Sequence, residues 1–219
     1  MNKLETIQKS YLKYALDGSS TQARQLVTEL LESGTPAIDL YHHVFYPTMV
    51  ETGELWQQNK ITVAKEHMIT ALTQNIIASL YPLLFKDLVD REIDQGNVLI
   101  ACPGGELHEL GIRMLADILE FEGWNVTYLG ANIPAEFIIE RLRESNFDIV
   151  GLSCSISFNL RFVKETIELA RQDGFKGPVL VGGRIFNTDP ALKNFVGANY
   201  YGKNFYEAVD ILKGISKPN

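Results

Sequence analysis

The second half of the chain repeats one pattern that restricts its possible folds more than any other feature: short apolar runs alternate with longer amphipathic segments. Runs that are almost continuously apolar are typical of strands buried on both faces of a parallel sheet. Regular alternation of strand and helix predicts a doubly wound α/β fold with five parallel strands. The predicted strands are 98–102, 125–129, 149–153, 179–181 and 198–200, and the predicted helices are 108–122, 134–144, 160–173, 190–195 and 205–213.

The first part of the chain has a different pattern, because its apolar residues recur at helical spacing. The breaks fall at turn residues such as Gly18 and Gly34, and Pro47 should kink or split the third helix. Four helices with short connections predict a four-helix bundle. We therefore expect a helical bundle over 1–91 and a Rossmann-like domain over 97–219, joined by the charged segment Arg91–Gly96. The predicted helices begin near residues 4, 22, 36 and 62, the segment 51–59 leads into the last of them, and that helix continues to about Asp90.

Composition excludes several kinds of partner. The 219 residues carry a net charge of −7, with a pI near 5.2, and include no basic run. We therefore expect no direct binding to nucleic acid or to an anionic membrane. The N-terminus lacks the apolar core of a secretory signal, and no apolar run reaches the length of a membrane span. These features, together with two cysteines that form no CxxC pair, predict a cytoplasmic protein with reduced thiols.

The loops that follow the first, third and fourth predicted strands are rich in small residues. In the flavodoxin-like strand order 2-1-3-4-5, these loops meet at one edge of the sheet, where ligands bind. The first loop also holds His108, with Glu106 two residues before it. A carboxylate in this place can orient the ring of a metal-binding histidine, although a solvent-facing histidine that caps a helix is the simpler alternative. The small residues of the three loops are Gly104 and Gly105, Ser153 and Ser155, and Gly182 and Gly183.

The common phosphate-binding motifs are absent, since no strand is followed by GxGxxG and no GxxxxGK[ST] occurs. Zinc needs three or four protein ligands, but the only histidines are at 42, 43, 67 and 108, and they form no tight cluster in the sequence. A cofactor that brings its own equatorial ligands needs one axial histidine, which points to a corrin or a haem. We see no nucleophile–base pair and no paired carboxylates, so we expect a protein that is not itself an enzyme.

The segment Glu106-Leu107-His108-Glu109-Leu110-Gly111 resembles the D/ExHxxG signature of cobalamin-binding domains. Gly151–Ser155 and Gly182–Gly183 resemble their second and third motifs. The resemblance implies that His108 is the lower axial ligand of cobalt and that Glu106 orients it, while Ser153 extends this relay or contacts the nucleotide tail. At position 106 the chain has Glu in place of the Asp that is usual in methyltransferases and mutases, and the Glu form is typical of the sensor branch. In the second motif, Ser155 replaces the usual Leu. The residues assigned to the lower side of the cofactor are Gly104, Gly105, Glu106, His108, Gly111, Ser153, Ser155, Gly182 and Gly183.

In the bundle, Trp56 is followed by nine residues and then by Glu66-His67. This pattern resembles the cobalamin domain of light-dependent MerR-type repressors of carotenoid genes, in which the bundle caps adenosylcobalamin. The resemblance implies that Trp56, Val63, Glu66 and His67 surround the adenosyl group. The alternative is that Trp56 is a core residue and Glu66-His67 is helix surface. Two departures stand out, because Gln57 replaces a cobalt-binding His of those repressors and the chain shows no DNA-binding helix-turn-helix.

Three functions fit these patterns. The first is a cobalamin-binding sensor, dependent on adenosylcobalamin and open to light as an input, that signals through a protein partner or through a change in oligomeric state. The second is a corrinoid protein that shuttles a methyl group within a cobalamin-dependent methyltransferase system, for which methylcobalamin or hydroxocobalamin would be the bound form. The third is a binder of another cofactor, such as haem, through His108. We favour the sensor because a methyl group needs no adenosyl-shaped pocket.

Overall fold

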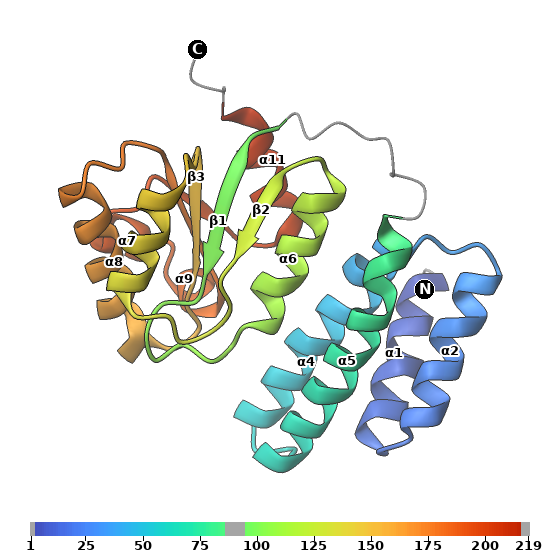
Figure 1. Ribbon diagram of the computed structural model, residues 1–219. Helices are drawn as coiled ribbons and strands as arrows, with labels where there is room; N and C mark the ends of the chain where they lie inside the picture. The colour runs from blue at the N-terminus through green and yellow to red at the C-terminus, as the bar shows by residue number, and fades with distance from the viewer. Residues whose placement is uncertain (1–2, 86–94, 216–219) are drawn as a thin grey trace. The chain divides into compact units, whose positions relative to one another are not determined.

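The computed structural model describes residues 3–85 and 95–215, which form two compact units, Met1–Val89 and Asp90–Asn219 (Figure 1). Most of the predicted linker, Arg91–Gly96, lies outside the described residues, as does the expected end of the long helix near Asp90. The predicted domain limits therefore stay predictions. Among the described helices, none is both long enough and apolar enough to span a bilayer.

The first unit is helical, as predicted. The expected third helix is continuous from α3 through a short π-helix, η1, into α4, so residues 3–85 form four helical segments (Figure 1). Thr62 begins the last of them as its N-cap, because its side-chain oxygen accepts a hydrogen bond from the backbone N–H of Lys65 at 3.3 Å. The helices are α1 (Lys3–Leu16), α2 (Ser20–Glu32), α3 (Ala37–Leu40), η1 (Tyr41–Phe45), α4 (Tyr46–Gln57) and α5 (Val63–Leu84).

Pro47 widens the third helical segment without breaking it. Proline lacks an N–H and its ring collides with the carbonyl four residues earlier, which is that of His43. The backbone accommodates the proline with a π turn, in which the N–H of Tyr46 donates to the carbonyl of Tyr41, five residues before it. The helix then continues to Gln57, so residues 51–57, which we expected to form a connection, are helical.

Aromatic side chains fill the core of the first unit. Tyr11 and Tyr41 both contact Phe45 edge to face, with ring centroids 5.4 Å and 6.0 Å apart, respectively. The hydroxyl of Tyr11 lies 3.1 Å from that of Thr73 and is completely buried. Burial raises the pKa of Tyr11 to about 12, although the hydrogen bond to Thr73 and the charge of Arg24 oppose the rise.

The second unit is a five-stranded parallel sheet in the order β2-β1-β3-β4-β5, flanked by helices. This confirms the predicted fold class. Strands β1 and β3 are neighbours in register, with Val98 opposite Ile149, so the loops that follow them begin side by side. The strands are β1 (Asn97–Ala101), β2 (Asn125–Tyr128), β3 (Ile149–Ser153), β4 (Val179–Gly182) and β5 (Tyr200–Gly202).

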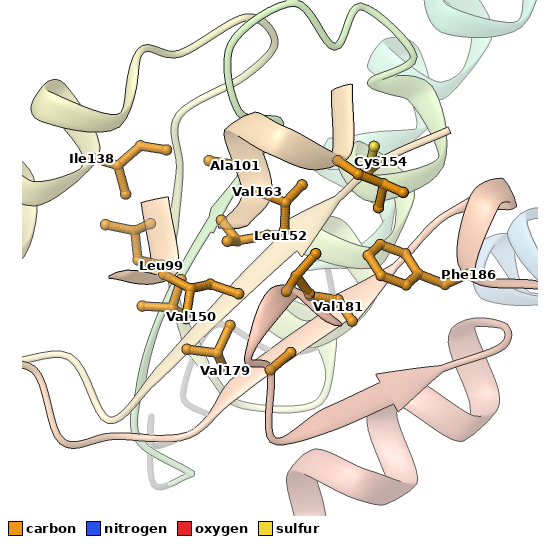
Figure 2. Packing of buried hydrophobic residues seen from close by; sticks show 14 residues of the cluster. Leu99, Ala101, Ile138, Val150, Leu152, Cys154, Val163, Val179, Val181 and Phe186 are labelled. Atoms are coloured by element: carbon orange, nitrogen blue, oxygen red, sulfur yellow. The ribbon is translucent and has the colours of Figure 1, made fainter. Parts of the chain in front are cut away.

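Both faces of the central strands are buried. Figure 2 shows one face, where Leu99, Val150 and Val181 pack in a common apolar cluster with helix residues. Alternate residues such as Val98 and Ile100 are also buried, and they point to the opposite face because side chains alternate along a strand. The helices are α6 (Leu110–Phe121), α7 (Ala135–Glu144), the 3₁₀ turn η2 (Ser157–Asn159), α8 (Leu160–Gln172), α9 (Arg184–Thr188), α10 (Leu192–Val196) and α11 (Phe205–Gly214).

Some element boundaries differ from the prediction, and one short helix was not predicted. Helix α6 begins at Leu110 instead of residue 108, because Glu106 binds the backbone N–H of His108 and holds it in the loop. Strand β5 begins at Tyr200 instead of residue 198, since Gly197 ends α10 in the left-handed conformation. The five-residue helix α9 was not predicted, because so short a helix has no measurable apolar period.

We expect Tyr11→Phe to change the alkaline stability of the protein. The folded state raises the pKa of Tyr11 from 10.0 to about 12, so this contribution to stability is present below pH 10 and is lost as pH rises toward 12. The unfolding free energy of the unsubstituted protein should therefore fall across this range by up to about 3 kcal/mol more than that of the variant. Urea unfolding at several pH values measures the difference. Tyr14→Phe, on the same helix but half-buried, is the control, and equal pH slopes for Tyr11→Phe and the unsubstituted protein would contradict the assignment.

Candidate functional site

A buried carboxylate lies at the centre of the loop edge of the sheet. Glu106 follows β1 by five residues and is 1% exposed. Its Oε1 atom accepts two hydrogen bonds from His108, one from the backbone N–H at 3.0 Å and one involving Nδ1 at 2.5 Å. Its Oε2 atom accepts hydrogen bonds from the loop that follows β3. Those donors are the backbone N–H groups of Ser155 at 2.7 Å and Ile156 at 3.3 Å and the side-chain amide of Asn159 at 3.3 Å.

These contacts keep Glu106 ionised. Burial by itself would raise the pKa of its carboxyl group. The hydrogen bond from the His108 ring, then those from the backbone of Ser155 and His108, and the charge of the imidazole outweigh burial and lower the pKa to about 2. Because the carboxylate is charged and Nδ1 of His108 faces it, Nδ1 is the ring atom that carries hydrogen in this pair.

The half-exposed ring of His108 therefore has the arrangement that metal-binding histidines show. In such sites one ring nitrogen is held by a carboxylate while the other meets the metal. The ring lies in the loop before α6, with 50% of its side-chain surface exposed, whereas its carboxylate partner is buried. Within residues 3–85 and 95–215, no three His, Cys, Asp or Glu side chains gather to hold a metal ion. What the site offers is one oriented imidazole.

The loop that carries His108 is fixed by its neighbour, the loop after β2. The N–H of Gly105, which has φ +78°, donates to the side-chain oxygen of Asn132 at 2.7 Å. The backbone N–H of Asn132 donates in turn to the carbonyl of Glu106 at 3.0 Å. Asn132 itself has φ +55°, a conformation that asparagine tolerates better than most residues. Sequence analysis did not identify Asn132, whose signal would have been an asparagine after Gly130 in a loop at the same edge.

The third loop joins the site through its backbone. The N–H of Cys154 donates to the carbonyl of Gly182 at 3.0 Å. Gly183 has φ +98°, and a Cβ atom there would lie 2.3 Å from the carbonyl oxygen of Cys154. Glycine at position 183 is therefore required by the close approach of two backbones, and the three predicted loops do come together.

The predicted serines differ in their contacts. Ser155 binds Glu106 through its backbone N–H, whereas Ser153 lies near Cys102 and opposes the rise in the pKa of its thiol. Burial, followed by the nearby charge of Glu106, raises the pKa of both buried thiols, that of Cys154 to about 12. Neither thiol is a nucleophile at neutral pH, because only the thiolate reacts.

Two of the predicted glycines differ in the space around them. A Cβ atom on Gly104 would touch the Phe162 ring at 3.5 Å, which is ordinary contact. A Cβ atom on Gly111, at the second position of α6, would meet no atom within 4 Å. Nothing in the described protein requires glycine at 111, so the open backbone beside His108 fits a bulky flat group that approaches closely.

A second group of predicted residues lies where α4 ends and α5 begins. Trp56 is 41% exposed and Val63 is 53% exposed, so Trp56 is not a core residue of the bundle. Glu66 lies in the first turn of α5, where its Oε1 accepts a hydrogen bond from the hydroxyl of Thr70 at 2.8 Å. Its Oε2 lies 2.5 Å from Nδ1 of His67. The surface thus combines exposed apolar groups with a carboxylate held at both oxygens.

Comparison with known proteins gives this arrangement a context. A family model described as the B12 binding domain matches residues 96–210, and a second model with the same description matches residues 7–81. These matches confirm the predicted resemblance to cobalamin-binding domains.

Among relatives, the HTH-type transcriptional repressor CarH of Myxococcus xanthus is 30% identical over 180 residues, which are 82% of this chain and 58% of the repressor. The dimethylamine corrinoid protein of Methanosarcina barkeri is 28% identical over 167 residues, which are 74% of this chain and 75% of that protein. The solved structure of the Methanosarcina barkeri monomethylamine corrinoid protein has a TM-score of 0.83, 17% identity, and coverage of 96% of this chain and 99% of the other. At this identity the last likeness shows a shared fold.

We expect Glu106→Gln to destabilise the protein even without a ligand. Glutamine keeps the shape of the side chain, but its NH₂ group would face the N–H donors that now surround a carboxylate oxygen. Buried donors left without an acceptor should cost about 2–4 kcal/mol of unfolding free energy, measured by urea denaturation. The exposed Glu165→Gln on α8 is the control and should change stability by less than about 0.5 kcal/mol. Equal stability of the two variants would show that the network does not hold the loops.

Proposed function

The chain belongs to the B12-binding family and binds cobalamin, since the family model covers more than half of its length, and from this premise we propose that it is an adenosylcobalamin-dependent sensor module. In this proposal it has no catalytic residues and signals through a protein partner or a change in oligomeric state.

The observation that carries the proposal is the exposed surface around Trp56. A large aromatic at helical spacing is usually buried, but Trp56 and Val63 are exposed at the same end of the first unit. An adenine ring offers a flat apolar face for the indole, and ribose hydroxyls can donate to the preorganised carboxylate of Glu66. A methyl ligand would use none of these features. We therefore propose that Trp56, Val63, Glu66 and His67 contact the adenosyl group.

On the lower side, we propose that Nε2 of His108 is the axial ligand of cobalt. The buried Glu106 holds Nδ1 and so directs the opposite edge of the ring outward. The open backbone at Gly111 leaves room for the corrin, and the loops that contain Ser153, Ser155, Gly182 and Gly183 lie along the path that we assign to the nucleotide tail.

Bound adenosylcobalamin supplies a cobalt–carbon bond that light can break, which makes light the natural input. Loss of the adenosyl group would remove the packing partner of Trp56 and so favour a second arrangement of the bundle, a population shift driven by differential binding. Gln57 stands where the repressors carry a second cobalt-binding histidine. We therefore expect no capture of cobalt by this residue after illumination.

A second function has independent support. Several relatives are named dimethylamine corrinoid proteins, and one of them is covered by this chain over 75% of its length. In that case the chain would carry a methyl group on cobalt between partner enzymes, and methylcobalamin would bind as well as the adenosyl form. Cofactor preference therefore separates the two candidates.

We expect His108→Ala to leave the fold intact while removing nitrogen ligation of cobalt. The absorption spectrum of the loaded variant should change to that of water-ligated or base-on cobalamin. Affinity should fall by about 10- to 100-fold, as for other losses at metal sites. His43→Ala, an exposed histidine in the π-helix, is the matched control. A variant spectrum identical to that of the unsubstituted protein would exclude the axial role.

We expect Trp56→Ala to weaken adenosylcobalamin by about tenfold or more in darkness and hydroxocobalamin by less than about twofold, because only the adenosyl form has a group for the indole to contact. Titrations followed by absorbance measure both affinities. Equal losses would mean that Trp56 does not recognise the upper ligand. If the unsubstituted protein binds methylcobalamin as tightly as the adenosyl form, and light leaves the size of the loaded protein unchanged, the methyl-shuttle function replaces the sensor.

A further inference from the structure

A second asparagine at the site lies in the connection after β3. Asn159 ends the 3₁₀ turn η2, directly before α8, and its backbone is helical, with φ −85° and ψ −9°. Its side chain makes no capping hydrogen bond to α8.

The side chain of Asn159 instead spans the two loops of the site and is only 4% exposed. Its amide donates to the carbonyl of Gly105 at 3.1 Å and to Oε2 of Glu106 at 3.3 Å. A Cβ atom on Gly105 would lie 2.8 Å from its Oδ1 atom, so the glycine loop packs directly on the amide. Asn159 therefore fixes both the orientation of the carboxylate and the backbone on which Glu106 is mounted.

The other N–H donors to this oxygen are main-chain groups. The N–H groups of Ser155 and Ile156 approach Oε2 from the same turn. They are set by the path of the backbone, whereas the amide of Asn159 is the donor that a substitution can remove. If Oε2 turns, Oε1 turns with it, because the carboxylate is planar and rigid. The position of the His108 ring, which Oε1 holds at 2.5 Å, then changes as well.

We propose that Asn159 is a positioning residue for the axial histidine: it locks the Glu106 carboxylate and the Gly105 loop so that the His108 ring is held at a single orientation toward cobalt. The inference rests on the proposed role of His108. Ser153 ends β3 and Asn159 ends η2, six residues later, and the asparagine amide, not the serine hydroxyl, extends the relay from Glu106.

Asn159→Asp is the sharpest test, because it keeps the shape of the side chain and replaces the donor with a negative charge beside Oε2. Asn159→Ala removes the donor without adding charge and decides the question if the aspartate variant does not fold. Asn194→Asp, on the exposed part of α10, adds the same charge away from the site and is the control. Two readouts are compared, one without cofactor and one with hydroxocobalamin.

In the cofactor-free protein, proton NMR should show the Nδ1–H of His108 as a downfield, exchange-protected signal. We expect this signal to shift or broaden in both Asn159 variants and to stay unchanged in Asn194→Asp. In the Asn159 variants loaded with cofactor and reduced to cobalt(II), the nitrogen splitting in the electron paramagnetic resonance spectrum should weaken. The affinity of these variants for hydroxocobalamin should fall by about tenfold or more, which is the range seen when the hydrogen-bonding partners of metal ligands are changed.

The two readouts separate the inference from the proposed function. If folded Asn159 variants keep the NMR signal, the nitrogen splitting and an affinity within twofold of the unsubstituted protein, the positioning role is overturned. If the unsubstituted protein shows no nitrogen splitting at all, the axial role of His108 fails, yet the NMR signal still decides whether Asn159 positions the ring.

Discussion

The site depends on one buried negative charge. A carboxylate removed from water is expensive unless hydrogen bonds replace the solvent, and Glu106 accepts five of them from N–H groups. The donors come from two loops that are far apart in sequence, so hydrogen bonds to this one carboxylate hold the loop after β1 against the loop after β3. Two of these contacts come from His108, so the network that holds the two loops together also sets the orientation of the His108 ring.

Much of the fold could be predicted because the apolar runs, the helical periodicity and the order of the segments all indicate the same parallel sheet. Apolar runs mark β1 and β3, and regular alternation with helices implies a parallel sheet with its loops gathered at one edge. The errors fall where tertiary contacts override local preference. Helix α6 starts late because a side chain binds the backbone of His108, and Pro47 is absorbed by a π turn that no apolar period reveals.

The site could be predicted in part, since its motif is local. Glu106 and His108 are two residues apart, so their pairing can be read directly from the sequence, and the three small-residue loops do meet. Asn132 and Asn159 could not be found this way, because each reaches the site from a different crossover and has no motif of its own. The reason for Gly183 was also hidden, because its neighbour is the backbone of another strand's loop.

The separation of the two loops along the chain also orders events during folding. Glu106 and the Ser155 amide are 49 residues apart, and they meet only when β3 has paired with β1 after a complete crossover through α6, β2 and α7. Closing so long a segment is a late and slow step compared with forming a helix. Before that step, the carboxylate lacks the N–H donors of the loop after β3, and only the local contacts of His108 are available to it. The arrangement of Glu106 and His108 is therefore complete only after β3 has paired with β1.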